Sequence, residues 1–222
     1  GNDIAIRNDT GVVEGGDISI HYDPMIAKLC TWGKSRDAAI GAMAEALDVF
    51  EVEGVGHNLP FVAAVMEMER FRRGDLSTAF IADEFPNGFS GVTPEDDAFH
   101  QLAVIAAFIH VKRTVRGADI SGTMENHKRI ISEEWIVSTN GRAVPVKVVR
   151  ENGGMGISVA GQGPTFVDSG WTPGASLGTF RIGALEVTAK INLVGSAIRL
   201  RRRGMDVLLN VRSPRVAELS KL

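Results

Sequence analysis

From position 134 to position 212, apolar and polar side chains alternate in short runs separated by turn residues. A period of two is typical of β-strands that bury one face. Turns such as Asn140-Gly141 and Arg203-Gly204 keep the connections short, which favours antiparallel neighbours in up-and-down order. The runs predict eight strands, at residues 134–139, 143–149, 155–161, 164–170, 176–183, 184–193, 196–203 and 205–212.

A long helix is predicted just before these strands, over residues 93–116. Pro94 and the three acidic residues after it favour a helix start, and the cations near position 116 suit a helix end. The segment 103–109 is apolar on every helical face, which is typical of a helix buried on all sides. We therefore expect the eight strands to form a barrel around the helix. The alternative, a helix lying on one face of an open sheet, should leave the helix a polar stripe.

The first part of the chain combines strands with helices. Residues 18–32 alternate and predict a hairpin-like strand region. A first helix should begin after Ser35, which can cap it, and end before Gly54. The pattern predicts a second helix over 58–74 and a third over 78–85. The fold class is therefore α+β, with strands and helices followed by the antiparallel barrel.

Charge divides the chain in two. Of its 222 residues 44% are apolar and 23% charged, and the net charge is −3. Residues 1–92 hold 7 Lys and Arg against 15 Asp and Glu, whereas residues 93–222 hold 17 against 12. We therefore expect one domain over 1–92 and another over 93–222. The single cysteine, Cys30, excludes an intramolecular disulfide, and no segment approaches the ~20 apolar residues of a membrane span.

The connection between the predicted helix and barrel, residues 117–132, is longer than usual and mixes apolar with charged side chains. That mixture is typical of a binding loop with apolar anchors and a polar rim. The alternative is a disordered loop whose apolar residues fold back on the barrel. The predicted partner-binding residues are Met124, His127, Arg129, Ile130 and Ile131.

Catalytic chemistry is not indicated. The five histidines show no metal-binding spacing, and no nucleophile elbow, dinucleotide or phosphate-binding loop is present. The glycines at 153–156 fit a hairpin turn better than a phosphate cradle. The run Arg199–Arg203 lacks interleaved aromatic residues, so it indicates a solvated strand face or a contact with acidic protein rather than a nucleic-acid site. We predict no catalytic and no metal-binding residue in this chain.

A resemblance covers the first part of the chain. Residues 18–29 read ISIHYDPMIAKL and resemble the YYD(S/P)MI(A/G)KL signature of the C-terminal subdomain of biotin carboxylases. Further matches keep the same order and spacing over residues 6–89, at 7–11, 36–37, 54–58 and 71–80. His57-Asn58 and the segment FPNGF at 85–89 are most similar to the α subunits that act on propionyl-CoA.

The resemblance also implies a fold for the second part of the chain. In this family of biotin-dependent acyl-CoA carboxylases, a BT domain comes next, with a long helix, a hook loop and an eight-stranded antiparallel barrel. Residues 211–222 resemble the segment that leads to the linker of the biotin-carrier domain. The hook loop, here 117–132, would bind the carboxyltransferase β subunit. Thr78 falls near the position that closes over adenine.

The implied parent enzyme uses ATP, with Mg or Mn, to carboxylate biotin, and passes the carboxyl group to propionyl-CoA on the β subunit. Its nucleotide loop would precede Gly1 and its biotin-bearing lysine would come after Leu222, so we expect this chain to be part of a longer protein and inactive alone. The resemblance implies a bacterial cytoplasmic or a mitochondrial matrix protein. Two alternatives are a non-enzymatic scaffold module and a 3-methylcrotonyl-CoA carboxylase α subunit.

Overall fold

The computed structural model of the chain describes residues 3–18, 21, 25–118 and 130–220. The chain divides into two compact units, Gly1–Gly91 and Val92–Leu222, which are described one at a time. No helix within these described ranges has both the length and the apolar character needed to cross a bilayer.

The first unit begins with a two-stranded antiparallel sheet. Strand β1 (Ile4–Thr10) pairs with β2 (Ala27–Gly33), with Ile4 opposite Gly33. Of the predicted hairpin-like strand region over 18–32, residues 27–32 lie in β2 as expected, whereas the described residues Ile18, His21, Met25 and Ile26 are not in a strand. The predicted residues at 19–20 and 22–24 lie outside the described part. The partner strand went unpredicted because all seven residues of β1 are exposed, so burial imposes no pattern on them.

Four helices come after the sheet. The Ser35 hydroxyl accepts a 3.2 Å hydrogen bond from the backbone N–H of Ala38 and caps the first helix, as predicted. The predicted helix 58–74 is two helices, because Met68 has extended backbone angles (ψ 127°) that end one and begin the next. The apolar side chains of the four helices form a small core around Ala44, Leu47 and Phe80. The helices are α1 (Arg36–Val49), α2 (Leu59–Glu67), α3 (Glu69–Arg73) and α4 (Phe80–Glu84).

The second unit contains a closed antiparallel barrel of eight strands, which confirms the predicted fold class. Each strand pairs with its neighbour in sequence, and pairing of β10 with β3 closes the barrel. The strands are β3 (Glu134–Thr139), β4 (Arg142–Glu151), β5 (Gly154–Val159), β6 (Thr165–Asp168), β7 (Leu177–Ile182), β8 (Leu185–Val194), β9 (Ala197–Arg202) and β10 (Met205–Arg212).

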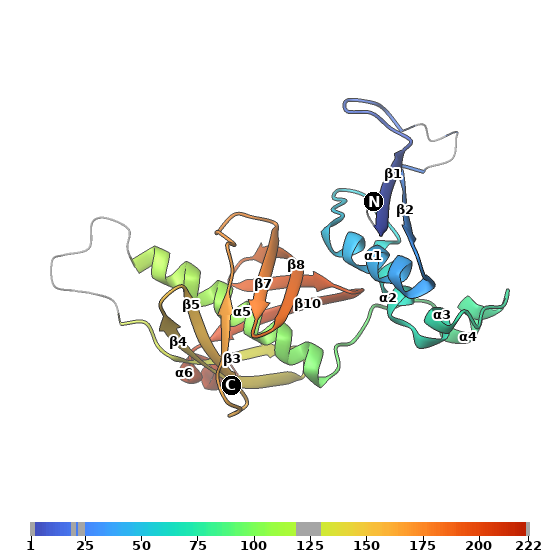
Figure 1. Cartoon of the computed structure of the whole chain (residues 1–222). Coiled ribbons are helices and arrows are strands. Elements are labelled where there is room, and N and C mark those ends of the chain that lie inside the picture. Colours follow the sequence, from blue (N-terminus) through green and yellow to red (C-terminus); the bar gives the residue numbers. More distant parts are fainter. Residues whose placement is uncertain (1–2, 19–20, 22–24, 119–129, 221–222) are drawn as a thin grey trace. The chain divides into compact units, whose positions relative to one another are not determined.

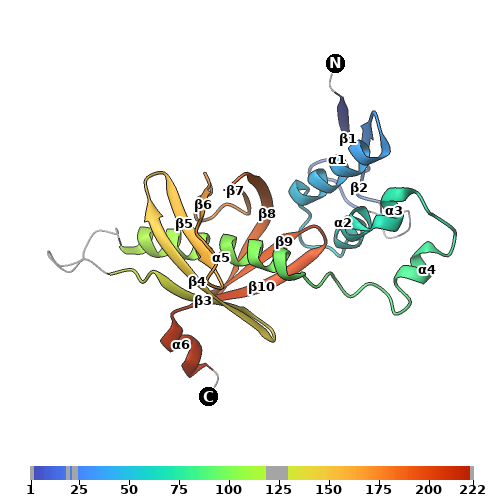
Figure 2. The same ribbon diagram turned by 60° about the horizontal axis from the view of Figure 1, so that its bottom comes forward.

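Helix α5 (Asp96–Ala118) runs through this barrel, as Figures 1 and 2 show from two directions. Every residue from Leu102 to Ile109 is buried, and inward side chains of the strands surround them in one core. The wrapped barrel was therefore the correct prediction, and the open sheet was not. The helix begins three residues later than predicted, since Val92 forms a parallel bridge with Met205 and the segment after it stays non-helical.

Arg142 fixes the start of α5 to the β3–β4 hairpin. Its guanidinium donates to the Pro94 carbonyl at 3.3 Å, forms an ion pair with Asp96 at 2.5 Å and stacks 4.0 Å from the ring centre of the buried Phe99. The carboxylate of Asp96 also lies in the first turn, where a negative charge is favoured. A short helix that the sequence did not predict, α6 (Pro214–Leu219), comes after β10.

Candidate docking surface

The structure places the predicted loop residues in two groups. Met124, His127 and Arg129 lie in the segment 119–129, outside the described residues. Ile130 has 95% of its surface exposed, whereas the adjacent Ile131 is half-buried and packs against the barrel core. Of the described pair, one isoleucine thus anchors the loop end to the barrel and the other faces solvent.

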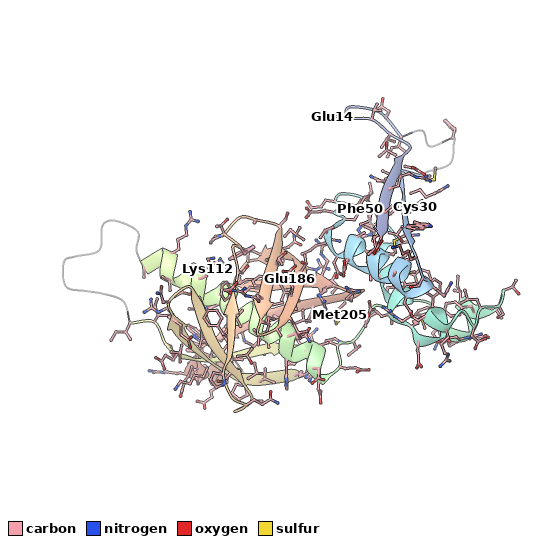
Figure 3. All side chains as sticks on the ribbon, viewed as in Figure 1. Glu14, Cys30, Phe50, Lys112, Glu186 and Met205 are labelled. Atoms are coloured by element: carbon pink, nitrogen blue, oxygen red, sulfur yellow. The ribbon has the colours of Figure 1, made fainter. Side chains whose placement is uncertain are left out.

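Lys112 holds the end of α5 from which the loop begins. Its ammonium group donates a 3.1 Å hydrogen bond to the Ser169 carbonyl and lies 5.5 Å from the centre of the Phe108 ring. Burial lowers the pKa of this amine. Figure 3 labels Lys112 in the C-terminal half of α5. The Lys112–Ser169 hydrogen bond attaches α5 to the β6–β7 connection, so the position at which the loop begins is well defined.

Hydrogen bonds also fix the conformation of the β6–β7 connection, whose Ser169 carbonyl accepts from Lys112. The Ser169 hydroxyl accepts from the backbone N–H of Trp171 at 3.1 Å and donates to the Thr179 carbonyl at 2.5 Å. The Trp171 indole N–H donates to the Ala175 carbonyl at 3.0 Å, and the ring is 4% exposed. The sequence analysis did not predict these hydrogen bonds, although Trp171, between two predicted strands, could have indicated a buried anchor there.

The loop ends at the start of β3. The Ser132 hydroxyl accepts from the backbone N–H of Glu134 at 3.1 Å, and the Glu133 carbonyl accepts from the backbone N–H of Val148 at 2.7 Å. The ring of Trp135 meets the ring of His110 edge to face, with 4.6 Å between their centres. Since His110 belongs to α5 and Trp135 to β3, this contact joins the two elements that bracket the loop.

The burial of His110 should make stability depend on pH. Burial, and then the positive charge of Arg113, lower the pKa of His110 below its usual 6.5. The unfolded chain therefore takes up a proton at a higher pH than the folded chain, so the free energy of unfolding should fall as pH drops below about 6.5 and level off below the folded pKa. Chemical denaturation of the barrel at several pH values measures this slope.

Two variants check the assignment of that slope. His110→Gln should flatten it, because the titrating group is gone. Arg113→Gln should make it shallower, because loss of the nearby charge lets the pKa of His110 rise toward its usual value. An unchanged slope in His110→Gln would mean that another group produces it.

Thr78, the predicted adenine-proximal residue, belongs to the first unit. It is exposed in the turn before α4, where the Ser77 hydroxyl accepts a 3.2 Å hydrogen bond from the backbone N–H of Ala79. Within the described part of the chain, no group of three or more His, Cys, Asp or Glu side chains is placed to hold a metal ion.

The glycines at 153–156 form a hairpin, as predicted. Gly153 has the positive φ of 84° that the β4–β5 turn requires. Gly154 lets the ring of Phe166 lie across β5: a Cβ at that position would be 2.6 Å from the ring and 2.5 Å from the Val167 carbonyl oxygen. These glycines therefore serve strand packing.

Comparison with known proteins accounts for both units. The family model for the biotin carboxylase C-terminal domain matches residues 2–83, and the model for the propionyl-coenzyme A carboxylase BT domain matches residues 102–222. The propionyl-CoA carboxylase alpha chain of Ruegeria pomeroyi is 46% identical over 218 residues, which are 98% of this chain and 32% of that relative. The mitochondrial alpha chain of Mus musculus is 31% identical over 224 residues, covering 97% of this chain and 30% of its own length.

A more distant relative belongs to another carboxylase. The mitochondrial methylcrotonoyl-CoA carboxylase subunit alpha of Oryza sativa subsp. japonica is 31% identical over 127 residues, covering 57% of this chain and 17% of the relative. The chain spans about a third of the length of the first two relatives. Because the BT-domain model matches more than half of the chain, the chain belongs to the propionyl-CoA carboxylase BT-domain family, preceded here by a biotin carboxylase C-terminal domain.

Proposed function

We propose that this chain is part of the α subunit of an ATP- and biotin-dependent propionyl-CoA carboxylase, which forms methylmalonyl-CoA from propionyl-CoA, bicarbonate and ATP. In this proposal residues 1–92 supply a non-catalytic end of the carboxylase domain, and the barrel docks the carboxyltransferase β subunit. The names of the relatives and the order of the two matched domains support the proposal.

One observation carries the docking role: Ile130 stands almost fully exposed beside a neighbour that is packed into the barrel core. An exposed apolar side chain on an anchored backbone costs little entropy to immobilise when a partner covers it. The Lys112–Ser169 and His110–Trp135 contacts position the two ends of the same loop. Met124, His127, Arg129 and Ile131 complete the proposed contact, with apolar groups at its centre and polar groups at its rim.

No step of the carboxylation is assigned to a residue of this chain. ATP with Mg or Mn, and biotin, would be held by other parts of the longer α subunit, and biotin would carry the carboxyl group between the two reactions. Thr78 is proposed only to lie beside the adenine, and its exposed position in the turn before α4 leaves its hydroxyl accessible to such a ligand. The soluble compartment would be the bacterial cytoplasm or the mitochondrial matrix.

Ile130→Glu in the full-length α subunit should weaken binding of the β subunit at least about tenfold, because a charge replaces an apolar group at the centre of the contact. The carboxylation of biotin by the α subunit alone should be unchanged. Val13→Glu is the matched control, since Val13 is a similarly exposed aliphatic residue (78%) in the other unit. Titration by size-exclusion chromatography measures the affinity, and equal affinity of Ile130→Glu and wild type would refute the docking role.

The acyl-CoA substrate needs its own measurement, because the resemblance places acyl choice on the β subunit and a methylcrotonoyl-CoA carboxylase is among the relatives. The reconstituted complex should carboxylate propionyl-CoA faster than 3-methylcrotonyl-CoA. The reverse order would assign the chain to the methylcrotonoyl enzyme. An α subunit that neither carries biotin nor turns over ATP would favour the scaffold alternative.

A further inference from the structure

The segment that connects the two units is held by the first unit as far as Phe89. Helix α2 provides the ring of Phe61, and the turn after α4 provides the rings of Phe85 and Phe89. The three rings contact one another edge to face, with 5.3 to 5.6 Å between their centres. Within the turn, the backbone N–H of Gly88 donates to the Phe85 carbonyl at 3.0 Å. These contacts fix Phe89 to the first unit.

The second unit holds the same segment from Val92 onward. Val92 forms a parallel bridge with Met205, the first residue of β10, which Figure 3 labels. Two residues later, the Pro94 carbonyl accepts a 3.3 Å hydrogen bond from the guanidinium of Arg142 on β4. Both contacts lie within the second unit, so the chain is fixed to the barrel on this side of the connection.

Two residues, Ser90 and Gly91, lie between these contacts. Both are exposed, and both lie outside the helices and strands. Gly91 has a φ of 98°, in the left-handed region that favours glycine, whereas a Cβ at this position would meet no atom within 4 Å. The backbone conformation, and not close packing, therefore favours glycine here. Two residues have four soft backbone torsions, which is enough to turn one rigid body relative to another.

We propose that Ser90 and Gly91 form a hinge about which the two units of this chain change their relative orientation; the role of the hinge in turnover rests on the proposed function. Hinges are commonly a few loop residues that absorb a change in φ and ψ while the packed elements on either side move as rigid bodies. In the proposed enzyme, the barrel stays docked on the β subunit while the carboxylase domain turns, so that biotin can reach the two reactions in succession. A fixed connection would confine the carboxylase domain to one orientation.

Gly91→Pro in the full-length α subunit tests the hinge, because proline cannot adopt a positive φ and also restricts the residue before it. Spin labels on unnatural amino acids at two exposed positions, Glu45 on α1 and Leu208 on β10, measure the distribution of distances between the units. The wild-type distribution should be broad, and Gly91→Pro should narrow it about twofold. Overall carboxylation of propionyl-CoA should fall at least about threefold, whereas carboxylation of biotin by the α subunit alone should be unchanged.

Matched variants separate the hinge from a local effect of the substitution. Gly54→Ala is the control for Gly91→Ala, since both glycines are exposed, have a positive φ (84° and 98°) and would place a Cβ in open space. Gly91→Ala should narrow the distribution of distances, and Gly54→Ala should leave it unchanged. Insertion of two glycines before Val92 should restore both the broad distribution and the turnover of the Gly91→Pro subunit. Should Gly91→Pro fold poorly, Gly91→Ala tests the same torsion with a smaller change.

The hinge and its role can be overturned separately. A narrow distribution in the wild-type subunit, or one that neither substitution of Gly91 changes, would overturn the hinge. A narrowed distribution with wild-type overall carboxylation would overturn its role in turnover. The distances are measured without the β subunit, so a failure of the wild-type α and β subunits to associate would contradict the proposed function and leave the result on the hinge intact.

Discussion

Replacement by Asp should destabilise the barrel strongly at each of four consecutive positions of α5, which are Val104, Ile105, Ala106 and Ala107. At Ile105 the free energy of unfolding should fall by about 4 kcal/mol or more, because a polar group without a partner would enter a core that is closed to water. All four side chains are buried, at 6% exposure or less. Together they cover about 300° of the helix surface. Denaturant unfolding followed by circular dichroism and tryptophan fluorescence measures the loss.

Matched variants separate burial from charge. Ile105→Val removes one methylene group and should cost only about 1 kcal/mol. Arg116→Asp places the same carboxylate on the same helix at an exposed position and should cost about 0.5–1 kcal/mol, from the unfavourable helix end. If one of the four Asp variants unfolded cooperatively with wild-type stability, that side of α5 would face solvent, as it would on an open sheet.

The barrel and its helix could be predicted because both leave strong local patterns. Inward residues such as Val146, Val148 and Leu200 recur with a period of two, and the apolar run of α5 has no polar stripe. Boundaries were less accurate where a long-range contact decides them. The bridge between Val92 and Met205 delays the start of α5, and the two partners are far apart in the sequence.

Elements without a buried face could not be predicted. Strand β1 is exposed along its whole length, and its identity depends on pairing with β2 across an intervening segment. The alternating pattern over residues 18–32 instead favoured a hairpin formed by residues that lie nearer to β2 in the sequence. The second helix of the first unit was predicted as one element, since its apolar residues continue past Met68 and only the backbone turn there divides it.

The sequence indicated residues 117–132 as a candidate docking loop, but the arrangement of its described side chains could not be predicted. Ile130 and Ile131 are identical in chemistry and adjacent in sequence, yet one is exposed and the other packs on the barrel. Lys112 illustrates the same limit: the sequence placed it near a helix end, but its hydrogen bond is to Ser169, 57 residues away. Such long-range contacts depend on how the barrel closes.

The glycines of the β4–β5 hairpin provide the other large expected effect. Gly154→Ala should destabilise the barrel by about 3 kcal/mol, because the added methyl group would overlap two neighbours. A Cβ at this position would lie 2.5 Å from the Val167 carbonyl oxygen and 2.6 Å from the Phe166 ring. The ring can rotate away, but the carbonyl belongs to the backbone of β6, which pairs with β5 at this point.

Gly156→Ala is the internal control for this effect, because it makes the same substitution two residues along the same strand. Its Cβ would overlap the Glu151 carboxylate, but that group ends a flexible side chain and can move. We therefore expect Gly156→Ala to change stability by less than about 1 kcal/mol, since glycine is itself unfavourable within a strand. Phe166→Ala should not rescue Gly154→Ala, because the Val167 carbonyl remains. Equal stability of the two alanine variants, measured by denaturant unfolding, would show that the strands of the hairpin can separate enough to accept a side chain at Gly154.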